Sequence, residues 1–509
     1  LYSGYQQEQL AQEESDMAAT RPGPDGPTTP HIVIIGTGFG GLGMAMQLKR
    51  AGIESFTMLE KAGSIGGTWR DNTYPGAACD VPSHLYSFSF EKKFDWSRRF
   101  APQAEILDYL RHCADKYRLR QHIRFGTSVN GARFDETAGL WHLDTSGGPV
   151  TARVLITATG QLNRPALPNL PGRDDFTGEA FHSARWNHEV DLTGKTVAVI
   201  GTGASAIQFV PEVAKQAKQV LLFQRSAPYV IPKPDRPYSA TEQRLMARFP
   251  VLQQLDRARV YAQNESRVLG FTSLQGAMRF HEYRFKKHLE HCVPDAETRA
   301  KLIPDYPMGC KRILISNDYY QALTEHRIPV FTGGVRAITA DGVEDADGRH
   351  HDADVIIYGT GFQATDFLAP MAISGRHGRD LNQAWQDGAE AYLGITVHGF
   401  PNLFMLYGPN TNLGHNSIIY MLESQIAYVV SALETLEREG HRFVDVRPDV
   451  QDDFNRALQA RMRDTVWEQG CESWYKTASG KNTNNWPGFT FSYRQQTRHL
   501  DPKDYELHP

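Results

Sequence analysis

The stretch from residue 31 to residue 41 reads HIVIIGTGFGG. A short apolar strand runs directly into Gly36, Gly38 and Gly41, which form a GxGxxG pattern. A helical pattern (LGMAMQLKRAG) and a second strand (FTMLE) follow, and that strand ends at Glu60, 24 residues after Gly36. Glycines here allow a tight turn and close approach to a pyrophosphate, and an acid about 20 residues on suits ribose hydroxyls. The stretch therefore predicts a dinucleotide site; an ordinary Gly-rich turn is the alternative.

The same unit recurs further along the chain. A strand (TVAVI, 196–200), the turn GTGASA (201–206), a helix and a strand (VLLFQ) follow one another. The second unit ends at Arg225, again 24 residues after its first glycine, so the charge at the end is inverted. An acid suits a free 2′-hydroxyl, whereas arginine suits a 2′-phosphate. We expect one FAD site, with the adenosine ribose on Glu60, and one NADPH site, with Arg225 on the phosphate. A solvated charge at the strand end is the alternative for Arg225.

Two further strands, VLITATG (154–160) and DVIIYGTGF (354–362), end in Thr-Gly pairs and bracket the second unit. This order predicts an α/β fold with two Rossmann-like dinucleotide-binding domains, the NADPH domain being inserted in the FAD domain. The expected divisions are a mobile tag or leader (1–30), an N-terminal segment of the FAD domain (31–170), the NADPH domain (171–350) with a helical appendage at about 240–300, and a C-terminal segment of the FAD domain with substrate and NADP loops (351–509). Residues 1–16 resemble a fusion or linker scar, and Met17 is a plausible native start.

Composition narrows the function classes. The 509 residues suggest two to four domains, and 40% hydrophobic residues supply enough material for sizeable cores. The formal net charge is −4, so we expect no nucleic-acid partner. No run of 18 apolar residues occurs, so we expect no membrane span. Five widely spaced cysteines disfavour a disulfide framework or a zinc site and favour a reducing, cytoplasmic location.

Residues 176–186 read FTGEAFHSARW, just before the second glycine turn. The pattern FxGxxxHxxxW resembles the fingerprint of the type I (class B) flavoprotein Baeyer–Villiger monooxygenase family. Its members here are Phe176, Gly178, His182 and Trp186. Related flavin-containing monooxygenases usually carry another aromatic residue in place of the final Trp. Asn187 departs from the family, which usually has Pro or Asp at this position.

Two further segments carry the resemblance. Residues 66–80 (GGTWRDNTYPGAACD) resemble the family motif [AG]GxWxxxx[FY]PGxxxD, and YPMGCKRILIS (306–316) contains a Lys-Arg pair. In isolation, Asp80 would be a turn carboxylate and the Lys-Arg pair a solvated face. The resemblance instead implies that Arg312 is the active-site arginine, that Asp80 is its partner, and that Lys311 contacts the NADP phosphate.

The C-terminal segment adds a tryptophan. Glu472-Ser-Trp474-Tyr matches the family position of a Trp near NADP and substrate, whereas Trp486 in NTNNWPG is expected to pack in the core. GPNTN (408–412) resembles the loop over the flavin. The complete expected FAD set is Gly36, Gly38, Gly40, Gly41, Glu60, Gly67, Thr68, Trp69, Asp80, Tyr86 and Val129. The complete expected NADP set is Gly201, Thr202, Gly203, Ser205, Ala206, Arg225, Ser226, Lys311, Arg312 and Trp474.

The resemblance implies an NADPH- and O₂-dependent enzyme that converts ketones to esters or lactones through a C4a-peroxyflavin and a Criegee intermediate, and that also oxidises sulfides. The expected partners are therefore a small ketone or sulfide and O₂, and the protein is expected to be a monomer or a dimer. Three alternatives stay open. They are a flavin-containing monooxygenase acting mainly on sulfur or nitrogen, a flavin disulfide reductase, which would need a redox cysteine pair, and a nucleotide-binding sensor.

Overall fold

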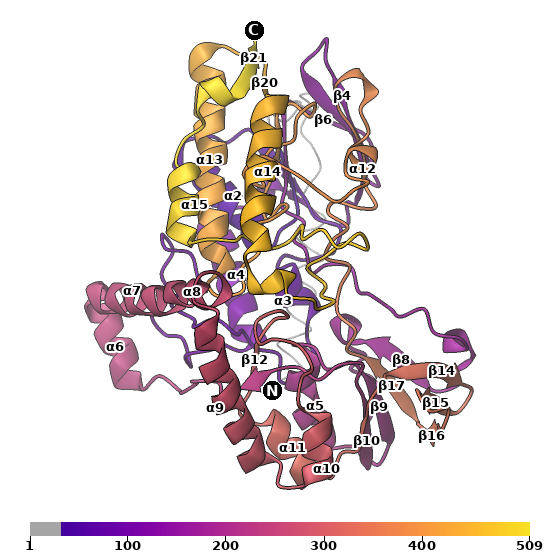
Figure 1. Cartoon of the computed structure of the whole chain (residues 1–509). Coiled ribbons are helices and arrows are strands. Elements are labelled where there is room, and N and C mark those ends of the chain that lie inside the picture. The colour runs from indigo at the N-terminus through magenta and orange to yellow at the C-terminus, as the bar shows by residue number, and fades with distance from the viewer. Residues whose placement is uncertain (1–31) are drawn as a thin grey trace, which may run out of the picture.

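The computed structural model describes residues 32–509, and two parallel five-stranded sheets organise it (Figure 1). The expectations for residues 1–30 lie outside the described residues. The first sheet has the order β19-β7-β1-β2-β3. Its strands are β1 (Ile32–Ile35), β2 (Phe56–Leu59), β3 (Ile123–Arg124), β7 (Val154–Thr157) and β19 (Leu403–Met405). Because β1 and β7 are buried on both faces, their sequences are continuous apolar runs.

The second sheet has the order β13-β10-β9-β17-β8. Its strands are β8 (Glu179–His182), β9 (Thr196–Ile200), β10 (Gln219–Phe223), β13 (Val330–Phe331) and β17 (Val355–Tyr358). All of them lie in sequence between β7 and β19 of the first sheet. The second domain is therefore inserted in the first, as predicted. The exact residue boundaries of the domains stay a prediction.

The chain crosses between the two lobes twice, and the two crossings lie side by side. The amide of Ala166 donates to the carbonyl of Gly361 at 2.9 Å, and the amide of Gln363 donates to the carbonyl of Arg164 at 3.0 Å. Pro165 and Phe362 form an antiparallel bridge in the same place. The entry and the exit of the inserted lobe are thus one short hydrogen-bonded ribbon.

Helices cover the sheets. On the first, α2 (Phe39–Arg50) packs against α13 (Ile418–Glu439) and α4 (Gln103–Lys116), and on the second α5 (Ala206–Ala214) packs against α11 (Tyr319–Glu325). The remaining strands form smaller sheets: β4 (Val129–Asp135), β5 (Leu140–Thr145), β6 (Val150–Ala152) and β18 (Ala372–Ser374); β14 (Val335–Thr339), β15 (Gly342–Asp345) and β16 (His350–Asp352); β11 (Val230–Ile231) and β12 (Leu314–Ile315); β20 (Phe443–Val446) and β21 (Tyr505–His508). The other helices outside the appendage are α3 (Thr68–Asp71), α12 (Leu381–Ala384), α14 (Pro448–Arg463) and α15 (Thr490–Gln496).

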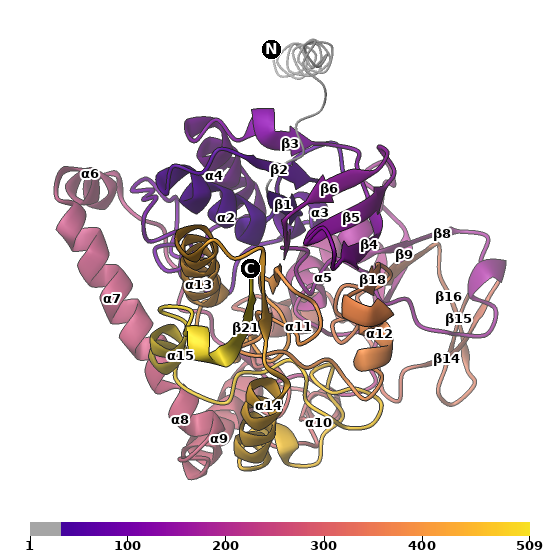
Figure 2. The ribbon, with the colours of Figure 1, turned by 90° about the horizontal axis from the view of Figure 1, so that it is seen from above.

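The predicted helical appendage is present. It comprises α6 (Ala240–Arg248), α7 (Pro250–Ser266), α8 (Val268–Phe271), α9 (Gly276–Cys292) and α10 (Ala296–Lys301). A capping box formed by Ser239 and Glu242 starts α6, and a proline starts α7. Viewed from above, α7 runs along one edge of the molecule (Figure 2). Buried Glu265 fixes its end, since that carboxylate accepts hydrogen bonds from the Asn416 side chain and from the amide and hydroxyl of Thr490.

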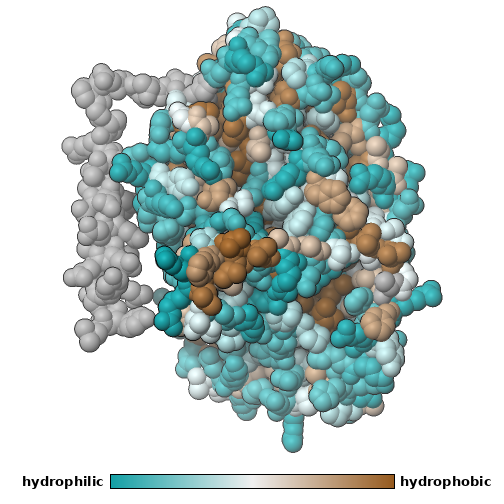
Figure 3. Space-filling model, turned by 90° about the vertical axis from the view of Figure 1, so that its left-hand side faces the viewer, coloured by the Kyte–Doolittle hydropathy of each residue, from teal (hydrophilic) through white to brown (hydrophobic). Residues whose placement is uncertain are grey.

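The outer side of the appendage is apolar in places. Figure 3 shows a hydrophobic cluster on the face that α6 and α7 occupy. The large apolar side chains exposed along these two helices are Leu245, Phe249, Val251, Leu252 and Leu255. Across residues 32–509, no helix is both long enough and apolar enough to span a bilayer.

The cysteines correct one expectation. Cys310 and Cys471 form a disulfide with their Cα atoms 6.3 Å apart, although 161 residues separate them in sequence. Sequence spacing does not reveal this pair because folding, not chain proximity, brings the two segments together. Cys79, Cys113 and Cys292 are free.

Candidate active site

A single large cavity of about 1610 Å³ lies where strands of both sheets end. Its wall includes the ends of β1, β2 and β7 from the first sheet and of β9 and β10 from the second. Ligands of open parallel sheets bind outside the carboxyl ends of the strands. Pockets for one small molecule span about 300–1,000 Å³, so this volume suits more than one ligand.

The first glycine of each turn is essential to the backbone course. Gly36 has φ +104° and Gly201 has φ +108°, in the region where side chains are strained. A Cβ atom at Gly36 would lie 2.7 Å from the carbonyl oxygen of Ala158, and one at Gly201 would lie 2.5 Å from that of Gly359. Both turns thus pass directly over the neighbouring strand end, which exposes the next residues to the cavity.

Two predicted cofactor residues, Gly41 and Ala206, do not line the cavity. A Cβ at Gly41 would lie 2.0 Å from the carbonyl oxygen of Gly36. The methyl group of Ala206 packs 3.2 Å from the position that a Cβ at Gly359 would take. The structure gives both residues the packing role of the third position in the motif, which allows close contact of helix and strand.

The helices that follow the turns leave their N-terminal amides free of side-chain caps. Neither α2, after Gly38, nor α5, after Ser205, has a side-chain hydrogen bond at its N-terminus. The first amides of a helix need acceptors, and the helix dipole favours an anion there. Residues 36–40 and 201–205 line the cavity, so each helix offers a diphosphate site. This arrangement fits FAD on α2 and NADP on α5.

Two aromatic residues of the expected FAD set, Trp69 and Tyr86, contact each other in the cavity wall. The indole Nε1 of Trp69 donates to the hydroxyl of Tyr86 at 3.2 Å, and the two rings meet edge to face. Gly67 has φ +53°, and a Cβ there would lie 3.1 Å from the Cα of Gly38, so the two glycine segments touch. Thr68 begins α3, Val129 begins β4, and both line the cavity.

Glu60 is buried and well bonded. Its carboxylate accepts from the amide and hydroxyl of Thr37 at 3.1 and 2.6 Å and from the amide of Ala62 at 2.9 Å. It also pairs with Arg70 at 3.2 Å. Glu60 therefore holds the first glycine turn against the end of β2 and lines the cavity. Its contact with the ribose stays a prediction.

Cations gather where the second unit ends. Arg225 is exposed after β10 and lines the cavity together with Ser226. The ammonium of Lys311 donates to Ser226 Oγ at 3.0 Å and lies 4.5 Å from the centre of the Tyr306 ring. Burial, followed by the charge of Arg225, lowers the pKa of Lys311. Within the described part of the chain, neither cation has an ion-pair partner, so the cluster suits an anion such as a 2′-phosphate.

Arg312 and Asp80 form an ion pair in the cavity wall. Arg312 Nη2 lies 2.5 Å from Asp80 Oδ2, and the two side chains are 31% and 34% exposed. Asp80 raises the pKa of Arg312 above its ordinary value. Burial alone would raise the pKa of Asp80, but the charge and hydrogen bond of Arg312, aided by the charge of Lys233, lower it. The predicted partnership is thus present in the geometry as a stable charge pair.

Several neighbours of this pair were not predicted. Tyr407, which lies before the GPNTN loop, has φ +65° and donates its hydroxyl to Asn412 at 2.7 Å. Burial raises the pKa of Tyr475, and although the charge of Arg312 counteracts this, the result is about 12. Tyr475 follows the predicted Trp474 directly in sequence, so the match at Trp474 could also have indicated Tyr475 as a neighbour of this pair. Lys233 lies in a Pro-rich stretch, VIPKPDRP, that gave no such indication.

Gln208 on α5 joins the two lobes beside Asp80. Its side-chain oxygen accepts from the hydroxyl of Tyr74 at 2.9 Å and from the amide of Ala78 at 3.4 Å. Its side-chain nitrogen donates to the carbonyl oxygen of Ala78 at 3.0 Å. The loop that carries Asp80 is therefore hydrogen-bonded to the inserted lobe. Nothing in the sequence singles out this glutamine among ordinary helix residues.

The fingerprint residues lie away from the cavity and support the second sheet. Phe176 packs on its core, and a Cβ at Gly178 would lie 2.5 Å from the carbonyl oxygen of Asp354. His182 Nδ1 accepts a hydrogen bond from the amide of Ala184 at 3.1 Å, and burial lowers its pKa to about 4. Trp186 packs on Phe209 of α5, with ring centres 5.4 Å apart. The fingerprint residues thus stabilise the packing of the inserted lobe.

The two candidate tryptophans separate clearly. Trp474 is 36% exposed, lines the cavity and contacts the Tyr475 ring at 4.5 Å. Trp486 is 1% exposed and packs edge to face on Tyr493, which confirms the prediction of a core position.

Two dinucleotide turns that face one cavity, with an ion-paired guanidinium in its wall, define an FAD- and NADPH-dependent oxidoreductase. A family model described as pyridine nucleotide-disulphide oxidoreductase matches residues 33–268. The chain is 48% identical to a Baeyer–Villiger monooxygenase of Pseudomonas aeruginosa over 96% of this chain and 93% of the relative. It is 45% identical to one of Streptomyces coelicolor over 94% and 92%. The chain therefore belongs to the Baeyer–Villiger monooxygenase family and is an NADPH-dependent flavoprotein monooxygenase.

A solved structure agrees with this assignment. The crystal structure of OTEMO in complex with FAD and NADP superposes with a TM-score of 0.85 at 29% identity, covering 94% of this chain and 100% of that chain. The fold class and the FAD and NADP cofactors expected from the sequence are confirmed. Membership in a monooxygenase family also removes the nucleotide-binding sensor from the alternatives.

Proposed function

We propose that the protein uses NADPH and O₂ to convert ketones into esters or lactones and that it also oxidises sulfides to sulfoxides. The observation that carries this proposal is the Arg312–Asp80 pair. It exposes a guanidinium to the same cavity that both glycine turns line. Insertion of oxygen beside a carbonyl places negative charge on the carbonyl oxygen, and a fixed cation stabilises that charge.

Bound FAD, reduced by NADPH, supplies the activated oxygen. Arg312 supplies a charge that does not depend on pH, because a guanidinium stays protonated and Asp80 raises its pKa further. Asp80 accepts from Nη2, so the carboxylate orients the guanidinium and leaves its other N–H groups free to bind substrate oxygen. Since Asp80 is itself held ionised, the pair acts as one positioned group.

Recognition of NADPH falls to the cation cluster at the end of the second unit. Arg225 and Lys311 together provide charge for a 2′-phosphate, and Ser226 positions the ammonium. A cofactor without that phosphate would leave both cations without a counter-ion in the site. We therefore expect a strong preference for NADPH over NADH.

Product identification tests the proposal. The protein is supplied with NADPH, O₂ and, in separate reactions, cyclic, linear, aromatic and steroidal ketones and an aryl sulfide, and products are identified by mass spectrometry. We expect an ester or lactone from at least one ketone, with NADPH consumed in proportion. Sulfoxide formation without any ester would instead place the protein among the heteroatom monooxygenases. A large loss of activity is expected on the same substrates when NADH replaces NADPH.

The disulfide raises the question of whether the protein is a flavin disulfide reductase. Cys310 is completely buried and Cys471 is 8% exposed, so a bulky disulfide substrate has no access to either sulfur. We expect that NADPH without oxygen releases no new thiols from the protein. A stoichiometric release of two thiols under those conditions would support reductase chemistry. A cytoplasmic location and a monomeric or dimeric state stay predictions.

A further inference from the structure

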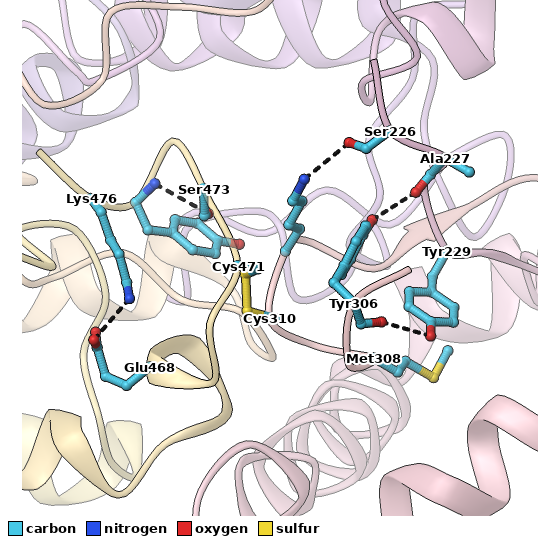
Figure 4. Close-up of a disulfide and its surroundings, with 12 residues drawn as sticks. Ser226, Ala227, Tyr229, Tyr306, Met308, Cys310, Glu468, Cys471, Ser473 and Lys476 are labelled. Atoms are coloured by element: carbon cyan, nitrogen blue, oxygen red, sulfur yellow. Dashed lines mark hydrogen bonds and ion pairs between the residues drawn. A yellow bond between two sulfur atoms is a disulfide. The ribbon is translucent and has the colours of Figure 1, made fainter. Parts of the chain in front are cut away.

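The disulfide joins two segments that both line the cavity. Cys310 directly precedes Lys311 and Arg312, and Cys471 lies three residues before Trp474. Figure 4 shows the bond between the Tyr306–Met308 segment and the loop that carries Ser473 and Lys476. A covalent link thus connects the segment of the catalytic guanidinium to the C-terminal loop of the other lobe.

Few other ties connect these segments. Over the described residues, no hydrogen bond or ion pair joins residues 469–480 to residues 306–315. The polar contacts of the loop are largely its own, since Lys476 pairs with Glu468 at 2.8 Å and the amide of Tyr475 donates to Ser473 at 3.3 Å. Apolar packing of Tyr475 in the cluster that contains Cys310, and the charge of Glu472 acting on Lys311, supply further non-covalent contact. The disulfide is therefore the strongest connection between the loop and the Arg312 segment.

Access to the bond is from the cavity. Cys471 is part of the cavity wall, whereas Cys310 is buried behind it. The free thiols are less accessible, because Cys79 borders the cavity but is only 3% exposed and Cys113 is buried in the core. Burial raises the pKa of both thiols, that of Cys113 to about 12. Such thiols are unreactive. Cys292 is partly exposed but lies at the end of α9, away from the cavity wall. Small redox reagents that enter the cavity thus reach one disulfide and, within the described residues, no other cysteine pair.

We propose that the Cys310–Cys471 disulfide is a redox-controlled tether that positions the Trp474 loop against Lys311 and Arg312. In the oxidised protein the loop is held over the nicotinamide end of the cavity; in the reduced protein it is released. The proposal rests on the proposed function, because it takes Lys311 and Trp474 as NADP contacts. It adds a control that the oxygenation chemistry itself does not require.

A dithiol can open the Cys310–Cys471 disulfide, and a peroxide can close it again. A dithiol opens the S–S bond by exchange: two electrons and two protons pass to the cysteines, giving two thiols, and the dithiol becomes a disulfide. A peroxide closes it: the two thiols lose two electrons and two protons, and one hydrogen peroxide becomes two waters. Once released, the loop regains conformational freedom that NADP binding must remove again. We expect roughly tenfold weaker NADP⁺ binding and more NADPH oxidised per ester formed.

Thiol counting and hydrogen exchange on the full-length FAD-bound protein test whether the tether exists and holds the loop. Of the five cysteines, three should react with a thiol reagent in denaturant before reduction, and five after treatment with dithiothreitol. Amide exchange of residues 469–480 should accelerate on reduction. Neither readout depends on oxygenation, so each would stand even if the proposed ketone chemistry failed. Five reactive thiols before reduction, or unchanged exchange after it, would overturn the tether.

Variants test the effect of the tether on NADP⁺ binding. Cys471→Ser and Cys310→Ser should each weaken NADP⁺ binding about tenfold, measured by titration, and should make it insensitive to dithiothreitol. Cys292→Ser is the matched control and should behave as the wild type, including its response to dithiothreitol. If Cys310→Ser does not fold, the dithiothreitol-treated wild type provides the same reduced state. Wild-type NADP⁺ affinity in Cys471→Ser would refute the proposal and leave the role of Arg312 unaffected.

Discussion

Replacing Arg312 by alanine removes the guanidinium that the ion pair with Asp80 presents to the cavity, so its effect can be worked out in advance. At an effective dielectric constant of about 20, two unit charges about 4 Å apart interact by roughly 4 kcal/mol. Arg312 is about one-third exposed, which reduces that figure to about 3 kcal/mol. Loss of one positioned oxyanion donor costs a similar ~3–4 kcal/mol. Ester formation should therefore slow by about 10²–10³-fold.

The assay compares two rates in the same sample. Ester is quantified by gas chromatography and mass spectrometry, and NADPH consumption is followed by its absorbance. Arg312→Ala should retain FAD and measurable NADPH oxidation, because the turns that hold the diphosphates are unaffected, while ester nearly disappears. Arg312→Lys keeps a positive charge but loses the planar guanidinium, so its rate of ester formation should lie between those of the wild type and Arg312→Ala.

A matched control removes a different Arg–carboxylate pair. Arg236 pairs with Glu242 at 2.7 Å beside α6, away from the cavity wall. Arg236→Ala should leave the ester rate unchanged within about twofold, because an exposed pair contributes about 0–1 kcal/mol to stability and nothing to this site. If Arg312→Ala formed ester at a rate close to that of Arg236→Ala, the assigned role of the guanidinium would be wrong.

Contacts elsewhere in the molecule allow the same kind of test at Arg225, His182 and Gln208. Arg225→Ala should raise the KM for NADPH about 10–100-fold with little change in kcat, because a charged hydrogen bond contributes about 1.5–3 kcal/mol. Steady-state kinetics with NADPH and NADH measure this effect, and a variant that still preferred NADPH would contradict the assignment. The pKa of His182 is about 4 in the folded protein and 6.5 in the unfolded chain, so the unfolded chain binds more protons between pH 6.5 and pH 4. The free energy of unfolding should therefore fall by up to about 3 kcal/mol as the pH drops from 6.5 to 4. His182→Asn, whose Oδ1 can still accept from the Ala184 amide, should flatten this dependence in denaturant titrations at several pH values, and an unchanged slope would argue against it. Gln208→Ala removes three hydrogen bonds between the lobes, so it should lower the free energy of unfolding by about 2–3 kcal/mol and raise the amount of NADPH oxidised per ester formed. Gln208→Glu should preserve the contact with Tyr74. If the wild type and Gln208→Ala oxidised the same amount of NADPH per ester, a positioning role for Gln208 would be refuted.

Local motifs predicted much of the fold and of the site. The turns beginning at Gly36 and Gly201 require positive φ and a close strand crossing, which only certain residues allow, so their sequences are distinctive. The pairing of Asp80 with Arg312 came from family resemblance, since 232 residues separate the two and each alone has an ordinary explanation.

What the sequence did not predict depends on contacts between distant segments. Gln208 and Lys233 are ordinary in their local sequence and acquire importance only when α5 and the 230–235 stretch approach the Asp80 loop. The wide cysteine spacing disfavoured a disulfide framework, yet Cys310 and Cys471 are paired, because their spacing in sequence contains no information about their distance in space. Gly41 and Ala206 were correctly placed in the motif, but they act on helix packing.

The paired crossings between the lobes have a practical consequence for protein engineering. Because Ala166 and Gly361 are hydrogen-bonded neighbours, the inserted lobe enters and leaves the first one through adjacent points. Segments with adjacent ends can be exchanged or inserted with little distortion of the host. The inserted lobe, cut at this ribbon, is thus a module that could be exchanged with that of a relative. Such a chimera would carry Arg225 and Lys311 together with Arg312, and would show whether coenzyme preference is transferred with this lobe.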